Sequence, residues 1–199
     1  MAFADMTLRA FLEDLGSRSP APGGGAAGAL AGALAAACAQ MVHNFTQEPL
    51  DIREGTEAEL VACCLALADA DALAFGGVAA AYKLPRDSSE GKTARQAAIQ
   101  AALRRAAEVP LQLAEAAVRI LGLAEPLARS GNRNVQSDVL VSAQLAEAAL
   151  LAAETNVRVN LALIKDEGFK AEAERRLQTA LGAARGLRPQ AVDVAGGRG

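Results

Sequence analysis

The fold is decided by the segment PGGGAAGALAGALAAACAQMV, which spans residues 22–42. From Gly25 to Val42 its only polar side chain is Gln40, and as a helix these residues would be about 27 Å long. A helix that is apolar on every side is normally a buried one. The segment therefore predicts the buried central helix of a helical bundle.

Small residues recur at every fourth position of this helix, at Gly24, Gly28, Gly32 and Ala36. This spacing predicts one face against which neighbouring backbones pack closely. The segment is also long enough for a membrane span, but leucine is scarce in it and glycine weakens an isolated helix. We therefore expect a bundle helix and no membrane partner.

The rest of the chain also favours helix. Of the 199 residues 52% are hydrophobic, many of them alanine, and no stretch alternates apolar and polar residues over the length of a strand. The sequence predicts an all-α multihelical bundle, with a single domain over residues 1–188 and a frayed tail over residues 189–199. The other expected helices are residues 7–15, residues 51–84 broken or loosened near Gly76-Gly77, residues 93–127 kinked or interrupted at Pro110, a helix from a cap at Ser137 or Asp138 to Lys165, and residues 169–184.

The composition argues against several classes of protein. A net charge of -3, 3% aromatic residues and no tryptophan give no signature of nucleic-acid binding. The cysteines, Cys38 and the adjacent Cys63 and Cys64, lack metal-ligand spacing and suit a reducing compartment. Residues 1–14 carry no basic region followed by an apolar run, as a signal peptide would. We expect a cytoplasmic protein with no metal site.

Two carboxylates interrupt the otherwise uncharged run of residues 61–81. Asp69 and Asp71 are two positions apart, so on a helix they point to nearly opposite sides. Asp71 shares its side with Phe75 and Tyr82, and apolar surroundings raise the pKa of a carboxyl group. Such a group suits general acid or base catalysis. The alternative is a carboxylate that hydrogen-bonds the end of a neighbouring helix.

Other polar groups each have a functional and a structural interpretation. Free amides at the glycine-rich helix start, residues 23–25, suit an anion or a substrate carbonyl, or reflect close packing only. Asn156 and Asn160 share one helix face with Asp138, and their amides suit a ligand's ring nitrogens or bonds to other helices. His43 suits a capping or packing role better than catalysis.

Four motifs follow one another along the chain. They are Ser19-Pro20-Ala21-Pro22-Gly23-Gly24-Gly25, Asp69-Ala70-Asp71-Ala72-Leu73-Ala74-Phe75, Tyr82-Lys83-Leu84-Pro85, and Gly131-Asn132 with Ser137-Asp138. In this order they resemble the formiminotransferase-cyclodeaminase family, in its cyclodeaminase domain and in the stand-alone bacterial methenyltetrahydrofolate cyclohydrolases. The resemblance covers most of the chain. It implies a multihelical bundle that acts as a homodimer on a tetrahydrofolate bearing a one-carbon unit, with no cofactor.

The resemblance also implies the roles of individual residues. It places the catalytic carboxylate on the Asp-x-Asp stretch, at Asp71 by motif position, with Asp69 as the less favoured holder. The implied substrate-binding residues are Gly23, Gly24, Gly25, Tyr82, Lys83, Arg86, Asn132, Ser137, Asp138 and Asn156. The anionic glutamyl tail of a folate suits four basic residues in two loops, which are otherwise solvated surface charges. These are Lys83, Arg86, Lys92 and Arg133.

Two reactions fit this resemblance. A cyclodeaminase converts 5-formiminotetrahydrofolate to 5,10-methenyltetrahydrofolate and ammonia, and a cyclohydrolase hydrolyses 5,10-methenyltetrahydrofolate to 10-formyltetrahydrofolate. The sequence leaves both open, because one carboxylate serves either reaction. The alternative to an enzyme is a non-catalytic helical module for folate binding or oligomerisation.

Overall fold

The structure, a computed structural model, describes residues 2–195. Within these residues it contains α-helices and short 3-10 helices and no strand, which confirms the predicted all-α class. The elements are η1 (Phe3–Asp5), α1 (Leu8–Leu15), α2 (Gly24–Asn44), α3 (Thr56–Tyr82), α4 (Ser89–Ser130), η2 (Arg133–Val135), α5 (Gln136–Leu161) and α6 (Glu167–Ala195).

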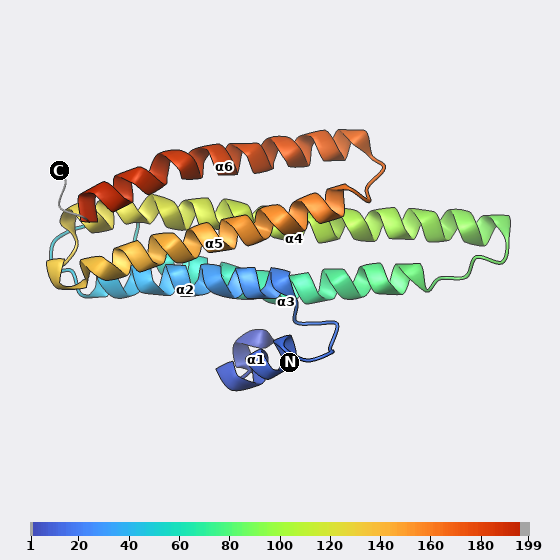
Figure 1. The fold of residues 1–199 in the computed structure, drawn as a ribbon, viewed down its shortest axis with the longest axis horizontal. Coiled ribbons are helices and arrows are strands. Elements are labelled where there is room, and N and C mark those ends of the chain that lie inside the picture. Colours follow the sequence, from blue (N-terminus) through green and yellow to red (C-terminus); the bar gives the residue numbers. More distant parts are fainter. Residues whose placement is uncertain (1, 196–199) are drawn as a thin grey trace.

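Helices α2 to α5 pack side by side as a bundle, and α6 lies along α4 and α5 (Figure 1). Helix α2 contacts α3, α4 and α5. It is the shortest of the four, so α3 and α4 continue past its N-terminus as an arm (Figure 1). The glycine-rich start of α2 therefore lies midway along the bundle, beside the middle of α3.

The face of α2 toward the bundle is built from small residues, as predicted. A Cβ atom added to Gly28 would lie 2.7 Å from the Cβ of Ala152 on α5. One added to Gly32 would lie 3.0 Å from the Sγ of Cys64 on α3. Gly24 does not belong to this face. It is exposed, and a Cβ atom added to it would have no neighbouring atom within 4 Å. Gly25 takes its place, since 3.6 residues per turn put positions three and four apart on one face.

The opposite face of α2 is uncovered. The prediction of a helix buried on every side is therefore wrong for this face. Leu34 is 51% exposed, and Val141 on the neighbouring α5 is 41% exposed. Helices α2 and α3 are both long and apolar enough to cross a membrane, by length and composition only, and core helices of soluble proteins pass the same test. The apolar residues of α2 thus serve two surfaces, one inside the bundle and one on its outside.

Two predicted interruptions are absent. Helix α3 continues through Gly76 and Gly77, and α4 continues through Pro110. Long packed helices tolerate such residues, because tertiary contacts outweigh the local cost of glycine or proline. Helix α3 also starts later than a cap at Asp51 would allow. It follows Gly55, whose φ of 81° lies in the left-handed region that favours glycine.

The last two helices also differ from the prediction at their ends. Helix α5 follows directly on the turn η2, and neither Ser137 nor Asp138 caps it. Helix α6 continues to Ala195, so the predicted tail is helical from residue 189 up to that point. Residues 196–199, the rest of the predicted tail, lie outside the described residues.

Candidate active site

Asp71 is a residue of α3, and its carboxyl group faces Gly25 at the N-terminus of α2. The contact is so close that a Cβ atom added to Gly25 would lie 2.1 Å from the Asp71 Oδ1 and 2.4 Å from its Cγ. The glycine-rich helix start and Asp71 are therefore brought together by the packing of α2 against α3. Only glycine fits at position 25 while the carboxyl group keeps this place.

The carboxyl group of Asp71 is half-buried, and burial raises its pKa above the usual value. The backbone amide of Ala26, in the first turn of α2, acts in the opposite direction because it favours the charged form. Burial is the larger effect, so Asp71 holds its proton to higher pH than an exposed aspartate does. A carboxyl group tuned in this way is suited to proton transfer.

A small cavity lies beside this carboxyl group, and we call it the Asp71 cavity. Its volume of about 10 Å³ is room for about one water molecule. It is lined by Gly25, Ala29, Leu67, Asp71, Val109, Pro110, Leu113, Ala153 and Asn156. Asp71 is the only titratable side chain in this lining. A ligand with a ring system does not fit inside, and the edge of α2 is one place from which it can meet the carboxyl group.

The first turn of α2 presents backbone donors at that edge. Gly23 is the N-cap residue, and the amides of Gly24, Gly25 and Ala26 have no acceptor within the helix, because an α-helix leaves its first N–H groups unpaired. No atom lies within 4 Å of the side-chain positions of Gly23 and Gly24. The Ala26 amide bonds the Asp71 carboxyl group, so a carbonyl or anionic group can approach the helix start at the exposed Gly24, next to Asp71.

Asp69 is engaged elsewhere. Its Oδ1 accepts a hydrogen bond of 2.7 Å from the backbone N–H of Phe3. This bond attaches η1 to α3, and the Phe3 ring packs edge-on against Phe11 with 5.5 Å between the ring centroids. Of the two aspartates, Asp69 anchors the N-terminal segment and Asp71 borders the cavity.

The two asparagines of α5 have different surroundings. Asn156 lines the Asp71 cavity, and its Nδ2 donates to the Ala152 carbonyl at 2.8 Å. Asn160 lies one turn further and joins two helices. Its Nδ2 donates to the Ala106 carbonyl on α4 and to the Asn156 carbonyl, both at 2.9 Å. Of the two interpretations left open for these amides, bonding between helices holds for Asn160.

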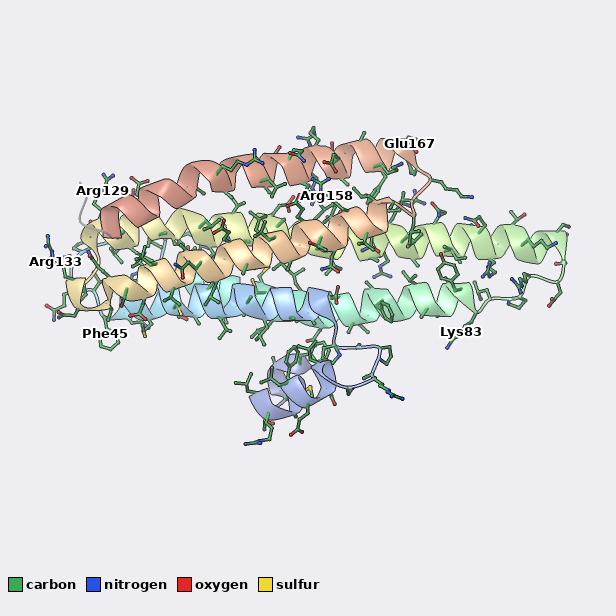
Figure 2. All side chains as sticks on the ribbon, viewed as in Figure 1. Phe45, Lys83, Arg129, Arg133, Arg158 and Glu167 are labelled. Atoms are coloured by element: carbon green, nitrogen blue, oxygen red, sulfur yellow. The ribbon has the colours of Figure 1, made fainter. Side chains whose placement is uncertain are left out.

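Three of the expected substrate-binding residues, Tyr82, Lys83 and Arg86, lie at the tip of the arm, about 16 Å beyond Asp71 along the helix. Figure 2 shows Lys83 at this end. The guanidinium of Arg95 lies 5.6 Å above the Tyr82 ring and donates to the Tyr82 carbonyl at 3.0 Å. Lys83 and Arg86 are exposed. These groups do not touch Asp71, and an extended ligand would be needed to reach both places.

Asn132 lies at the other end of the bundle, beyond the C-terminus of α2, and Ser137 and Asp138 lie in the first turn of α5, where Asp138 is beside Cys38 of α2. Figure 2 shows Phe45 and Arg133 together at this end. The full length of α2, about 30 Å, separates Asn132 from the Asp71 cavity, and the 13 residues of α2 from Gly25 to Cys38 place Asp138 about 20 Å from it. A single chain therefore does not bring these expected substrate-binding residues, or Arg133, to Asp71.

Asn132 has a structural role at that end. Its Nδ2 donates to the Phe45 carbonyl at 2.9 Å, and its backbone N–H donates to the Thr46 Oγ1 at 3.1 Å. These bonds fasten the turn before α5 to the end of α2. Asp138 lies close enough to Cys38 to help burial raise the pKa of that thiol.

The sequence analysis gave no site or packing role to two residues that have one in the structure. Pro110, predicted only as a kink, lines the Asp71 cavity. A proline within an apolar helical pattern is the signal that marks it. Glu57 is 2% exposed, and its Oε1 lies 2.6 Å from the Nδ1 of His43, so His43 packs against α3. No sequence signal marks Glu57, because an acidic residue in the first turn of a helix is usually solvated.

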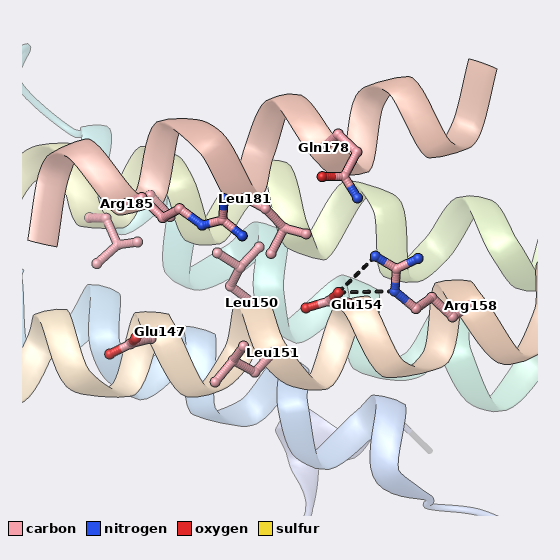
Figure 3. A pocket seen from close by; sticks show the side chains of 10 residues that line it. Glu147, Leu150, Leu151, Glu154, Arg158, Gln178, Leu181 and Arg185 are labelled. Atoms are coloured by element: carbon pink, nitrogen blue, oxygen red, sulfur yellow. Dashed lines mark hydrogen bonds and ion pairs between the residues drawn. The ribbon is translucent and has the colours of Figure 1, made fainter. Parts of the chain in front are cut away.

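The bundle also has two wider grooves, of which the one between α3 and α4 shares Val109 with the Asp71 cavity. One runs between α5 and α6, has a volume of about 340 Å³, and has Leu150 and Leu181 among its apolar lining residues (Figure 3). Glu154 and Arg158 form an ion pair of 2.9 Å beside it. The other groove, of about 610 Å³, lies between α3 and α4 and is lined largely by small residues. The groove in Figure 3 shares no lining residue with the Asp71 cavity.

The fold and the site define a class of protein: an all-helical bundle with one partly buried carboxyl group held against a glycine-rich helix start. Sequence comparison identifies the family within that class. A profile described as formiminotransferase-cyclodeaminase matches residues 7–179. The chain belongs to the formiminotransferase-cyclodeaminase family.

Individual relatives agree with this assignment. A formimidoyltransferase-cyclodeaminase of Rattus norvegicus is 37% identical over 186 residues, which are 89% of this chain and 34% of that protein. A methenyltetrahydrofolate cyclohydrolase of Methylorubrum extorquens is 38% identical over 194 residues, with 91% of each chain covered. The crystal structure of formiminotetrahydrofolate cyclodeaminase from Thermotoga maritima matches with a TM-score of 0.85, 30% identity and 98% of each chain covered. The chain spans about a third of the length of the formimidoyltransferase-cyclodeaminases it matches.

Proposed function

We propose that this protein is a folate one-carbon enzyme. It converts 5-formiminotetrahydrofolate to 5,10-methenyltetrahydrofolate and ammonia, hydrolyses 5,10-methenyltetrahydrofolate to 10-formyltetrahydrofolate, or catalyses both reactions. The observation that carries the proposal is the carboxyl group of Asp71, partly buried against Gly25 at the start of α2. The names of the relatives support both activities, since they include cyclodeaminases and a cyclohydrolase.

In the deaminase reaction N10 of the folate attacks the formimino carbon carried by N5 and loses its proton. The new carbon–N10 bond gives a tetrahedral centre, and the bond from this carbon to the formimino nitrogen then breaks. That nitrogen takes up two protons to leave as ammonia: the first balances the proton that N10 loses, and the second comes from an acid. Protonated Asp71 supplies the proton, and its raised pKa keeps the group protonated to higher pH than an exposed aspartate.

In the hydrolase reaction water adds to the methenyl carbon, a base takes the proton of the water, and the bond to N5 breaks while N5 is protonated. Asp71 in its charged form is the base, and the Asp71 cavity has room for about one water molecule. The departure of ammonia needs protonated Asp71 and the addition of water needs charged Asp71, so the two reactions use opposite protonation states of this group. The two activities should therefore respond to pH in opposite directions as Asp71 titrates.

The edge of α2 positions the substrate for either reaction. The glycine-rich start of α2, Gly23 to Gly25, binds a carbonyl oxygen of the folate through the backbone amides that the first turn leaves unpaired. This contact brings the one-carbon unit to Asp71. Asn156, on the opposite wall of the cavity, adds an amide side chain from α5.

The basic residues at the tip of the arm hold the anionic glutamyl tail. Lys83, Arg86 and Lys92 are exposed there, and folate in an extended form spans the distance from Asp71. Tyr82, 47% exposed, provides an aromatic surface beside these basic residues. Raising the salt concentration should raise KM for a polyglutamylated substrate more than for one with a single glutamate.

The active species is a homodimer that uses the uncovered face of α2 and α5. We call this the α2–α5 face, and it comprises Leu30, Leu34, Cys38 and Met41 of α2 with Val141, Leu145, Ala148 and Ala152 of α5. The two rows are adjacent, since α2 and α5 pack side by side and the row residue Ala152 contacts α2. An apolar face of this length is typical of a surface covered by a partner. A second copy presents the same face, as a symmetric dimer requires.

The protein acts in the cytoplasm, on this proposal, and needs neither a metal nor an organic cofactor nor a nucleic-acid or membrane partner. The unpaired cysteines Cys38, Cys63 and Cys64 support a reducing compartment. The chemistry above consists of proton transfers at nitrogen and oxygen, for which one carboxyl group is a sufficient catalyst.

The test is a side-by-side assay of both substrates with the wild-type protein and Asp71→Asn. We expect the substitution to lower kcat by about 100-fold or more, with the far-ultraviolet circular dichroism unchanged. Asp69→Asn is the matched control. It should lower stability by loosening η1 and leave kcat within about twofold, since its carboxylate bonds Phe3. Wild-type turnover in Asp71→Asn would refute the assignment.

The rival function is a folate-binding or oligomerisation module without catalysis. It is favoured by the small size of the Asp71 cavity, which holds no ring system. Tight binding of a reduced folate with no change of either substrate over many equivalents of enzyme would establish it.

A further inference from the structure

Helix α4 carries Pro110 at a point that lines the Asp71 cavity. Proline has no backbone N–H, so the Ala106 carbonyl, four residues earlier, loses its helical donor, and the proline ring pushes that carbonyl aside. A carbonyl left unpaired between helices is unfavourable. The structure provides another donor, the Nδ2 of Asn160 on α5, at 2.9 Å.

The same amide group makes a second bond. Asn160 Nδ2 also donates to the Asn156 carbonyl at 2.9 Å, so its two hydrogens join α4 to the turn of α5 that carries Asn156. Pro110 and Asn156 are both lining residues of the Asp71 cavity. Asn160 itself lies outside the lining and acts through these two residues.

We propose that Asn160 is a positioning residue, which holds the Pro110–Asn156 wall against the carboxyl group of Asp71 by bonding the carbonyl that Pro110 leaves unpaired. The proposal rests on the proposed function for its activity readouts and on the geometry of α4 and α5 for its stability readout. The wall matters because burial is the main cause of the raised pKa of Asp71. Among the described residues that line the cavity Asp71 is the only titratable one, so the part of the pH profile that is lost in Asp71→Asn reports on Asp71.

The first test is Asn160→Ala, with Thr155→Ala as the control. Thr155 is exposed on the same helix, and its hydroxyl bonds only the Leu151 carbonyl of that helix. We expect Asn160→Ala to lower kcat by about tenfold with KM within about twofold, because the reacting groups are misplaced while the binding edge of α2 is unchanged. The part of the pH profile in which activity changes as Asp71 titrates should move to lower pH. Water that enters the cavity reduces the burial that raises the pKa of Asp71. Thr155→Ala should change neither kcat nor this part of the pH profile.

The second test uses Pro110→Ala, with Pro126→Ala as the control proline of the same helix, outside the cavity lining. Alanine at position 110 restores the N–H, so Ala106 regains a donor within α4. In the Pro110→Ala background, Asn160→Ala should therefore cost less in the urea midpoint than it does in the wild type. In the Pro126→Ala background it should cost as much as in the wild type.

The outcomes separate the two proposals. An unchanged kcat and pH profile in folded Asn160→Ala would overturn the positioning role, and equal costs in all backgrounds would overturn the link to Pro110. If the wild type turns over neither folate substrate, the proposed function fails, and the midpoints still measure the link between Asn160 and Pro110.

Discussion

The carboxyl group of Asp71 occupies the space that any side chain at position 25 would need. The two residues belong to different helices and are 46 positions apart in the sequence. One provides the acid or base, and the other, by having no side chain, lets that group reach the amides of the first turn of α2. The site exists only while both conditions hold.

Gly25→Ala should therefore displace Asp71. The added carbon would lie 2.1 Å from the Asp71 Oδ1, so the carboxyl group or the start of α2 must move. We expect kcat/KM to fall about 100-fold and the free energy of unfolding to fall by about 1–3 kcal/mol. The control is Gly76→Ala, at an exposed helical position with no atom within 4 Å, which should raise stability by up to about 1 kcal/mol. Equal activity in the two variants would contradict the contact.

The raised pKa of Asp71 has a consequence for stability. Its folded value lies above the usual value of 3.8, so between these two values the folded chain binds more protons than the unfolded chain. The free energy of unfolding should therefore fall as pH rises through this window, and then level off for this group. Asp71→Asn lacks that fall. Urea titrations of both proteins across pH should show the variant gaining stability relative to the wild type as pH rises, and a relative loss would contradict the sign.

Leu34→Glu should separate the proposed dimer. Leu34 is 51% exposed at the middle of the uncovered face of α2, and a charge there would be buried without a partner in the interface. Light scattering should give the mass of two chains for the wild type and of one chain for the variant. Leu8→Glu is the control, since Leu8 is 66% exposed on α1, away from this face. A wild type that is monomeric without detergent would refute the dimer, and one that needs detergent would indicate a lipid-covered face.

Arg176→Ala should loosen α6 from the bundle. The Arg176 guanidinium donates to both carboxylate oxygens of Glu108 and to Glu115, each at 2.9 Å, and these bonds further raise its pKa. We expect the free energy of unfolding to fall by about 1–3 kcal/mol. The neighbouring Arg175 makes an exposed pair with Glu172, so Arg175→Ala should leave the unfolding midpoint unchanged. Equal effects of the two substitutions would contradict the anchoring role of Arg176.

The helices could be predicted because their signals are local. Apolar composition and the turn residues around Gly16 and Pro85 were sufficient to place α1 and most of α2 and α3. The errors occur where packing outweighs a local signal. Gly76 and Pro110 lie inside continuous helices, and α6 extends past residue 189. The part of the Asp71 cavity that α4 lines could not be predicted. Pro110 lies there only because of the way α4 is aligned along α3 and α5, which the local sequence does not show.

An apolar glycine-rich segment and one aspartate among apolar neighbours are properties of the chain, so helical class and a candidate acid could be inferred before any contact was known. The different surroundings of Asp69 and Asp71 were decided by the tertiary structure. Asp69 bonds Phe3, and Asp71 meets Gly25, contacts made across 66 and 46 residues of sequence. Packing also placed Asn132 a helix length away from Asp71 and left one face of α2 open. Such long-range contacts depend on how whole helices register against one another, which no local pattern encodes.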